Sequence, residues 1–596
     1  MSERKVTFGR IFWPSFWAAI VVSILGAAIW FIVISVFVSS LEPEPYSVDS
    51  NSILHIKLEN GVNERGETKL DPSTFTVQNK LSLAAVLHGL EAAKTDDKVK
   101  GVFIELGSLQ CGMATAREIR NAINDFEESG KFAVAYHTGE AIATREYYVA
   151  SAANESYGFP SSNVQFLGLG GELSFFKGTL DKMDVEVQVV RGSNNDFKSA
   201  VEPFFRKEMS DSARLQNQRY LSSMWFDIRS DISKDRKVSV EELDRIAENA
   251  EIIDVRDAVK HKLIDAAKYR DEVLEILAEK VGAKNVEDLE LEDFNKYAKK
   301  KFYQDQVLKQ ADKPNIAVIL AEGGVAKSGD GLTSDDICKL FKDVRNDDNI
   351  KTVVFRVNSP GGSALASDEI WREVKLTNEK KKVIISMGDL AASGGYYISA
   401  PGSHIFADPL TITGSIGVFG MIPYTGKMLE NKFGMTFDRV QTNKHSVLTT
   451  NRKLTDEEFA LIQKSVDDIY EQFKSRVAEG RNMTKKEVNV IGRGRVWTGS
   501  DAQKIGLVDE LGGMKDAIAY AAKQAGITEQ KIVYYPKVKE DKWSEILEQL
   551  EEKDALEVKM NTAQLPEEFV GYYEQLKTLE QMQGIQMRMP FEIVFK

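Results

Sequence analysis

An internal repeat is the feature of this 596-residue sequence that most restricts its possible folds. Three matches share one spacing of 249 residues: Tyr147-Tyr148 with Tyr396-Tyr397, Pro160 with Pro409, and Gly168 with Gly417. Three matches in a single register are hard to obtain by chance. We therefore interpret the chain as a tandem duplication of one structural unit.

Each copy shows apolar runs typical of buried strands, alternating with amphipathic helical patterns. Residues 99–106 resemble residues 350–357, and both runs are short and rich in β-branched residues. A further strand is predicted at 382–386, and a helix at 455–479 that Gly480 ends. Alternating strands and helices predict βαβ crossovers and a largely parallel, buried sheet. The predicted fold class is therefore α/β, built twice.

The predicted domain organisation has four parts. A cytoplasmic N-terminus covers 1–15, a transmembrane anchor 16–40, the first repeat 41–305, and the second repeat 306–596. A charged segment at about 280–312 is expected to form an exposed helix between the copies. The acidic extension from Lys537 onward is expected to form exposed helix and tail.

The anchor prediction rests on 23 uncharged residues between Phe16 and Val38. A run of this length can span a bilayer, which needs about 20 apolar residues. Arg4, Lys5 and Arg10 precede it, so the N-terminus should stay in the cytoplasm and the remainder should face outward. A cleaved signal peptide is the alternative, because Val38-Ser39-Ser40 is a tolerable cleavage site, although its apolar region would be unusually long.

Charge and cysteine content exclude several classes of function. The 77 Lys and Arg residues against 90 Asp and Glu residues give a net charge of −13, so no general attraction to nucleic acid is expected. Two cysteines are too few for a zinc site built on paired cysteines, and no HExxH motif occurs. We therefore expect neither a metal nor another cofactor.

Two glycine-containing motifs in the second copy are candidates for catalytic chemistry. The segment Asn358-Ser359-Pro360-Gly361-Gly362 follows a predicted strand, where free backbone N–H groups could form an oxyanion hole. Ser393 lies between small residues, which permits a sterically open strand-to-helix junction with the serine at the helix N-terminus. An ordinary tight turn and a simple serine N-cap are the alternatives.

The residues alone leave the base for Ser393 open. The six histidines show no recognisable spacing to an acidic partner. Ser174-Phe175-Phe176-Lys177 fits an SxxK pattern, but the motifs that accompany it in known enzymes are absent.

Four segments together resemble the signal peptide peptidase A family, in its long, duplicated bacterial form. They are 358–362, 392–397, Thr413-Gly414-Ser415-Ile416-Gly417 and 501–509. The resemblance implies a ClpP/crotonase-like fold in each half and a serine/lysine peptidase that degrades signal peptides left in the membrane. It also implies an inner-membrane protein with its catalytic part on the periplasmic side, forming a homo-oligomer, a tetramer by resemblance.

The same resemblance implies the roles of the site residues. Ser393 would be the nucleophile, Lys198 of the first half the general base, and Ser415 the residue that orients the lysine. Gly361, Gly362 and Gly394 would form the oxyanion hole.

The repeat itself supports a divided site. By the 249-residue spacing Ser393 corresponds to Thr144, and Gly394-Gly395 correspond to Arg145-Glu146, so the first copy lacks the open serine junction. In the second copy Lys444 lies near the place that matches Lys198, but in a shorter segment. Two other functions stay open: a crotonase-like acyl-CoA enzyme, and an inactive peptidase-like scaffold that binds apolar peptides.

Overall fold

The computed structural model describes residues 48–59, 61–70, 77–303, 313–329, 331–537 and 585–589. From Ser50 onward the chain forms one compact unit. The predicted cytoplasmic segment at 1–15, the anchor at 16–40 and the repeat boundary between 305 and 306 lie outside the described residues. Within these described ranges, no helix combines the length and apolarity needed to cross a membrane.

The first copy is built on a six-stranded sheet in which every pair of neighbours is parallel. Its strand order is β11-β8-β6-β5-β1-β12. The bounds are β1 Ser52–Leu58, β5 Val99–Leu106, β6 Phe132–His137, β8 Glu155–Gly158, β11 Ala266–Ala267 and β12 Leu291–Asp293.

The second copy repeats this order in an eight-stranded sheet. The path β24-β13-β16-β18-β19-β23 matches β12-β1-β5-β6-β8-β11 strand for strand, and β20 and β22 continue from β18. The bounds are β13 Ile316–Glu322, β16 Thr352–Ser359, β18 Val383–Ala392, β19 His404–Ala407, β20 Ile412–Gly414, β22 Val496–Thr498, β23 Glu510–Leu511 and β24 Ile532–Tyr535. The identical order agrees with a tandem duplication and with the α/β class. The more specific ClpP/crotonase-like assignment stays a prediction.

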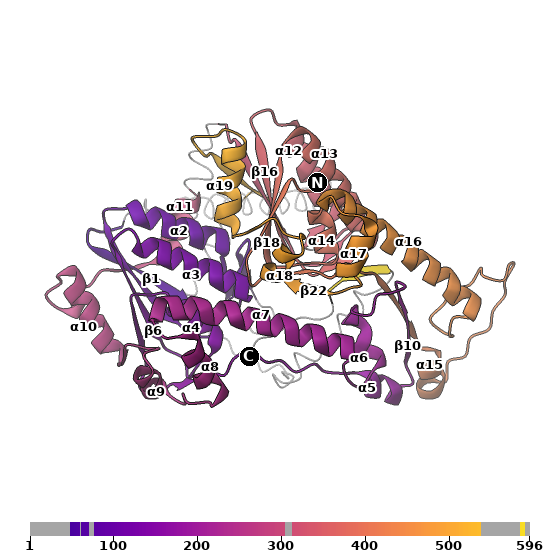
Figure 1. The fold of residues 1–596 in the computed structure, drawn as a ribbon, viewed down its shortest axis with the longest axis horizontal. Helices are drawn as coiled ribbons and strands as arrows, with labels where there is room; N and C mark the ends of the chain where they lie inside the picture. The colour runs from indigo at the N-terminus through magenta and orange to yellow at the C-terminus, as the bar shows by residue number, and fades with distance from the viewer. Residues whose placement is uncertain are drawn as a thin grey trace, which may run out of the picture. The chain divides into compact units, whose positions relative to one another are not determined.

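The helices also recur in corresponding order. The pairs are α2 (Leu83–Thr95) with α12 (Ser334–Asn346), α3 (Met113–Glu127) with α13 (Ala364–Lys380), α4 (Thr144–Ala150) with α14 (Gly394–Ser399), α7 (Asp211–Arg236) with α16 (Asp456–Arg481), α8 (Val240–Glu248) with α17 (Lys485–Ile491), α9 (Val255–Lys260) with α18 (Gly499–Lys504), and α10 (Arg270–Val281) with α19 (Met514–Gln524). Figure 1 shows α2 beside α3 and α12 beside α13. The remaining elements are β2 (Val62–Asn63), β3 (Glu67–Leu70), β4 (Val77–Ser82), β7 (Ala141–Ile142), β9 (Asn163–Val164), α5 (Lys177–Lys182), α6 (Glu202–Phe205), α11 (Phe294–Tyr303), α15 (Gly426–Phe433) and the 3₁₀ turns Ser199–Val201 and Val286–Asp288.

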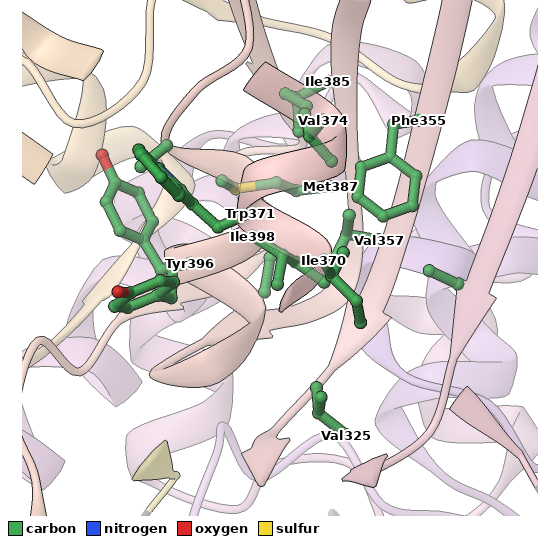
Figure 2. Close-up of a cluster of buried hydrophobic side chains, with 14 of the residues drawn as sticks. Val325, Phe355, Val357, Ile370, Trp371, Val374, Ile385, Met387, Tyr396 and Ile398 are labelled. Atoms are coloured by element: carbon green, nitrogen blue, oxygen red, sulfur yellow. The ribbon is translucent and has the colours of Figure 1, made fainter. Parts of the chain in front are cut away.

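Both faces of the second sheet are buried, which explains its nearly continuous apolar strands. Alternate residues of β13, such as Ala317 and Ile319, join a cluster that contains Ile337 of α12 and Ile370 of α13. Figure 2 shows part of this cluster, with Val374 of α13 drawn among the strand residues Phe355, Val357, Ile385 and Met387. The intervening residues, such as Ile316 and Val318, join a second cluster with α19. The period of two along each strand thus places one set of side chains on each face.

A third, mixed sheet joins the two copies. Its order is β10-β21-β25-β17-β14-β15. The bounds are β10 Glu186–Arg191, β14 Val325–Ala326, β15 Leu332–Thr333, β17 Gly361–Ser363, β21 Phe419–Tyr424 and β25 Ile585–Arg588. Strand β10 comes from the first copy and pairs antiparallel with β21 of the second. Backbone hydrogen bonds therefore hold the lysine-bearing half in register with the serine-bearing half.

Three local predictions are corrected. Helix α16 continues through Gly480 to Arg481, so this glycine does not end the helix. A Cβ at Gly480 would come within 1.9 Å of the Ala400 carbonyl oxygen, so the glycine permits close packing there. The segment at 280–312 contains strand β12 before the short helix α11. The C-terminal extension, predicted as helix and tail, contributes the buried strand β25 (yellow in Figure 1).

Candidate active site

Ser393 lies at the sharp junction between β18 and α14. Its backbone has φ 57° and ψ −113°, a conformation that L-residues rarely adopt. Its N–H donates to the Gly414 carbonyl at 2.8 Å, and its carbonyl accepts from Tyr397 N at 2.9 Å. Such a strained backbone costs about 1–3 kcal/mol and persists only where the surroundings hold it. The small neighbours seen in the sequence make this turn sterically feasible.

Lys198 lies in the first copy, directly before the 3₁₀ turn at Ser199–Val201. Its Nζ donates to Ser393 Oγ at 2.8 Å, to Ser415 Oγ at 3.0 Å and to the Ser415 carbonyl at 3.0 Å. The structure therefore brings together three residues that the resemblance had singled out, from two different copies.

All three side chains are fully buried. Burial disfavours the charged ammonium, and it lowers the pKa of Lys198 well below its ordinary value. A neutral amine has a lone pair and can accept a proton from the adjacent serine. The arrangement therefore supplies a candidate nucleophile and a candidate base in direct contact.

Ser415 is held in place by hydrogen bonds from its backbone and its hydroxyl to the segment Gly494-Arg495. Its N–H donates to the Arg495 carbonyl at 2.7 Å, and its φ of 51° turns the chain sharply after Gly414. Its hydroxyl and its carbonyl both face Lys198 Nζ. Ser415 is therefore placed to fix the position of the amine.

The glycines of the second copy pack against the serine junction. A Cβ at Gly394 would lie 3.1 Å from Gly361 Cα and 3.1 Å from Gly362 N, so the two motifs meet backbone to backbone. As the first residue of α14, Gly394 has an N–H without an intrahelical acceptor. The Gly361 N–H donates to Ser359 Oγ at 3.2 Å. This differs from the expectation that Gly361 supplies an oxyanion donor, because a side chain already uses its N–H.

The corresponding place in the first copy is closed by side chains. The equivalent helices α3 and α13 begin at Met113 and Ala364, which are 251 positions apart. With this spacing, Leu109 in the loop before α3 corresponds to Pro360 in the loop before α13. Glu146 accepts from Leu109 N at 2.9 Å, and Arg145 donates to the Leu109 carbonyl at 2.8 Å. Thr144 donates its hydroxyl to the Gln165 carbonyl. Side chains thus bind the first-copy loop where the second copy has two glycines.

The alternative bases do not reach the buried serine. Lys444 is exposed and paired with Glu457, and His445 lies beside the same carboxylate. Lys177 of the SxxK match pairs with Asp181 on the same helix. No cluster of metal-binding side chains occurs in the part of the chain that the structure describes.

Two buried amide side chains that the sequence did not single out hold the lysine segment. Asn195 Oδ1 accepts from Val418 N at 3.2 Å, which ties this segment to the turn after Ser415. Gln216 Nε2 donates to the Phe197 carbonyl and to Ser199 Oγ, on either side of Lys198. Asn195 stands three residues before Lys198 and could have been noticed in the sequence, whereas nothing in the sequence marks Gln216.

Comparison with known proteins identifies the family of the chain. The sequence matches peptidase family S49 twice, over residues 126–284 and 375–528. The two matches together cover more than half of the chain. The chain belongs to peptidase family S49.

Curated relatives of this S49 member match across most of their length. The chain is 34% identical over 468 residues to the chloroplastic serine protease SPPA of Arabidopsis thaliana, covering 76% of this chain and 67% of that protein. It is 34% identical over 471 residues to Protease 4 of Salmonella typhi, covering 76% and 74%. Protease 4 of Haemophilus influenzae is 33% identical over 455 residues, covering 74% and 73%. The resemblance to the long, duplicated signal peptide peptidase A form is confirmed, and the chain is a serine-type peptidase.

Proposed function

We propose that this S49 peptidase is a serine/lysine endopeptidase with a single active site divided between its two copies. The observation that carries the proposal is the 2.8 Å contact between Lys198 Nζ and Ser393 Oγ in a fully buried setting. A lysine in water has a pKa of about 10.4 and is a cation that accepts no proton. Desolvation of Lys198 removes this obstacle.

In the proposed reaction, neutral Lys198 takes the hydroxyl proton of Ser393 as the serine oxygen attacks a peptide carbonyl. The protonated amine stays hydrogen-bonded to Ser415 through its hydroxyl and carbonyl oxygens. Lys198 then returns the proton to the leaving amine, which gives an acyl-enzyme. Water, deprotonated by the same lysine, hydrolyses the ester and restores Ser393.

The negative charge on the tetrahedral intermediate requires backbone donors. The N–H groups of Gly362 and Gly394 are the proposed pair, because the two backbones pack directly on one another. Gly394 also begins α14, where the helix dipole favours negative charge. Gly361 would serve this site by leaving space rather than by donating.

The proposed substrates are signal-peptide remnants and other apolar peptides, and the proposed location is the outer face of a bacterial inner membrane. The uncharged run between Phe16 and Val38 and the basic residues before it support a single anchor with a cytoplasmic N-terminus. The homo-oligomer, a tetramer by family resemblance, belongs to this proposal too. External protease should digest the catalytic part in spheroplasts, and its protection in intact spheroplasts would refute this topology.

A serine-directed phosphonate probe tests the chemistry directly. It should label Ser393 of the full chain, and Ser393→Ala should abolish the labelling. Lys198→Met keeps an unbranched side chain but removes the amine, so labelling should become much slower. Labelling that persists in Ser393→Ala, or that keeps its full rate in Lys198→Met, would refute the proposed pair. A complete lack of labelling in the natural sequence would favour a scaffold or an acyl-CoA enzyme.

A further inference from the structure

A cavity of about 260 Å³ lies between helices α13 and α16 of the second copy, beside the loop that follows α14. These three helices are neighbours in Figure 1. The cavity walls include Trp371 and Lys375 of α13, Arg476 and Gly480 of α16, and Pro401 of the loop. We propose that this cavity is a binding site for a carboxylate, supplied either by a small organic acid or by the free carboxyl end of a peptide.

The first copy has a carboxylate at the place that corresponds to this cavity. Helices α7 and α16 are both 26 residues long and begin 245 positions apart, at Asp211 and Asp456. With this spacing Asp235, near the end of α7, corresponds to Gly480 in the cavity wall. Because glycine has no side chain, the second copy lacks the carboxylate that the first copy carries there.

The groups that bind this carboxylate in the first copy also have counterparts in the cavity wall. Asp235 accepts hydrogen bonds from the fully buried Arg120 and from Asn124 Nδ2. The 251-residue spacing of α3 and α13 matches Arg120 with Trp371 and Asn124 with Lys375. Trp371 and Lys375 both carry N–H donors. The second copy therefore has donors at these places but no carboxylate at residue 480 to accept from them.

A neighbouring ion pair has its charges exchanged between the copies. In the first copy Arg117 of α3 donates to Asp231 of α7 at 2.8 Å. The same two spacings match these residues with Asp368 of α13 and Arg476 of α16, and Arg476 donates to Asp368 at 3.3 Å. The exchange puts a guanidinium in the cavity wall where the first copy has a carboxylate. A cation at this place favours an anionic ligand.

Two buried donors of the cavity wall have no acceptor. Trp371 is 3% exposed, and its Nε1 has no hydrogen-bond partner within the described part of the chain. The same is true of Arg476 Nε, and the guanidinium carbon of Arg476 lies 3.6 Å from the centroid of the Trp371 ring. Buried donors are nearly always paired in folded proteins. A ligand carboxylate would supply the acceptors that these two stacked groups lack.

Two acidic residues, Glu379 and Glu479, also line the cavity and restrict the ligand to a single negative charge. Both are exposed to solvent, and Glu479 is paired with Lys375. Arg476 uses its terminal Nη2 for Asp368, which leaves its Nε without an acceptor. The donors can therefore serve one carboxylate group, whereas a dianion would be repelled by the two acidic side chains.

Titration with acetate tests the site on the full chain labelled with ¹⁵N-tryptophan. The Trp371 Nε1–H resonance, assigned by its loss in Trp371→Phe, should shift and saturate with a Kd in roughly the millimolar range. Acetamide has nearly the same shape without the charge, so it should bind at least ~10-fold more weakly. A Trp371 resonance that acetate does not move, or that acetamide moves equally, would overturn the inference.

A pair of matched variants locates the binding. Trp371→Phe keeps an aromatic ring and removes the N–H donor, so the relaxation of ¹³C-labelled acetate should report binding weaker by about 10-fold. Trp225→Phe is the control, because Trp225 Nε1 already donates to Asp244 at 2.9 Å, and it should bind acetate as the natural sequence does. If Trp371→Phe does not fold, Lys375→Gln replaces it and should weaken binding in the same direction. Unchanged acetate binding in the variant would contradict the proposed site.

A second titration distinguishes the two sources of the carboxylate. It uses Ser393→Ala, so that peptide cleavage does not interfere, and compares acetate with acetyl-alanyl-alanine and with the C-terminal amide of that peptide. Tighter binding of the peptide acid than of acetate would identify free peptide ends as the source, and exclusion of the peptide acid would identify small organic acids. Equal binding of the peptide acid and its amide would refute a carboxylate site. All these readouts measure binding, so they stand or fall independently of the proposed peptidase chemistry.

Discussion

Lys198 Nζ lies 2.8 Å from Ser393 Oγ, although the two residues are 195 positions apart and come from different copies of the repeat. Each copy contributes one member of this contacting pair. The site therefore exists only while the copies stay in register, which the β10–β21 pairing and buried ion pairs between the copies enforce.

Ser415→Ala should reduce kcat by a moderate amount. It removes one of three hydrogen-bond acceptors of Lys198 Nζ and leaves the Ser415 carbonyl in place. A hydrogen bond is worth about 1 kcal/mol, so kcat should fall roughly 3- to 10-fold with little change in KM. Lys198→Met should cost about 10²- to 10⁴-fold, because the general base itself is lost. Steady-state kinetics on one apolar peptide checks both variants, and Ser174→Ala, at a half-buried serine, is the control. An equal loss of kcat in Ser415→Ala and Lys198→Met would contradict a positioning role for Ser415.

Lys198→Met should stabilise the protein, and more so at lower pH. The folded-state pKa of Lys198 is depressed, so between that pKa and about 10.4 the unfolded chain binds one more proton than the folded chain. The free energy of unfolding of the natural sequence therefore rises with pH in this range and falls as pH decreases. Lys198 contributes up to about 1.4 kcal/mol per pH unit to this slope.

The variant lacks this dependence, so its advantage in Tm should be largest near neutral pH and shrink toward pH ~10. Thermal unfolding of both proteins at several pH values measures the difference. Lys207→Met, at an exposed lysine, is the matched control and should show no such trend. A Tm difference that stays constant with pH would mean that Lys198 is charged in the folded protein.

Gly494→Ala should impair catalysis by displacing the lysine. Gly494 has φ 81°, and a Cβ there would lie 2.5 Å from Lys198 Cβ and 2.6 Å from Lys198 N. Because a shift of about 1 Å can cost roughly 100-fold in rate, kcat should fall by up to that factor. Gly434→Ala is the control: its φ is 66°, but nothing lies within 4 Å of the added Cβ. Gly434→Ala should lose about 1 kcal/mol of stability through backbone strain and keep its kcat. Similar kcat values for Gly434→Ala and Gly494→Ala would argue against tight placement of Lys198.

Arg356→Met should destabilise the contact between the copies. Arg356 of β16 is fully buried and donates to Glu118 of the first copy at 2.6 Å and to Glu64 at 2.9 Å. Removing one partner of a buried ion pair costs about 3–5 kcal/mol, because the remaining charges are left unpaired. Urea unfolding measures the loss. Lys327→Met, at an exposed pair with Glu369, should cost less than about 1 kcal/mol.

Arg356→Met should lose the least stability at acidic pH. Burial already raises the pKa of Glu64 to about 7 despite the nearby guanidinium, and loss of Arg356 raises it further. A folded-state pKa above the unfolded value means that stability falls as pH rises through this range. The defect should therefore be larger at pH 8 than at pH 5, and Glu64→Gln with Glu118→Gln should relieve it. A defect independent of pH would show that lost packing dominates.

Local patterns in the sequence determined much of the fold. The run at 99–106 coincides with β5, because a short segment rich in β-branched residues and bounded by polar turns favours a strand over a helix. The small residues around Ser393 determined a sterically open junction, and the repeated Tyr-Tyr pair marked equivalent helices. In both copies the first tyrosine donates to a leucine carbonyl of the matching segment, Tyr147 to Leu263 and Tyr396 to Leu507.

Only the tertiary structure decided which groups meet. The residues alone left the base open and the family resemblance pointed to Lys198, but the exposure of Lys444 and the burial of Lys198 follow from packing around β10 and β21. Gly480 resembles a helix terminator, yet the helix continues to Arg481 and is capped by the left-handed Asn482. Only the packed structure shows that the Ala400 carbonyl leaves no room for a side chain at residue 480. The charged C-terminal extension gave no sign of the strand β25, since four residues become a strand only when β17 and β21 supply both edges. Sequence patterns record what each segment prefers locally, whereas a site made from residues hundreds of positions apart depends on contacts that no local preference encodes.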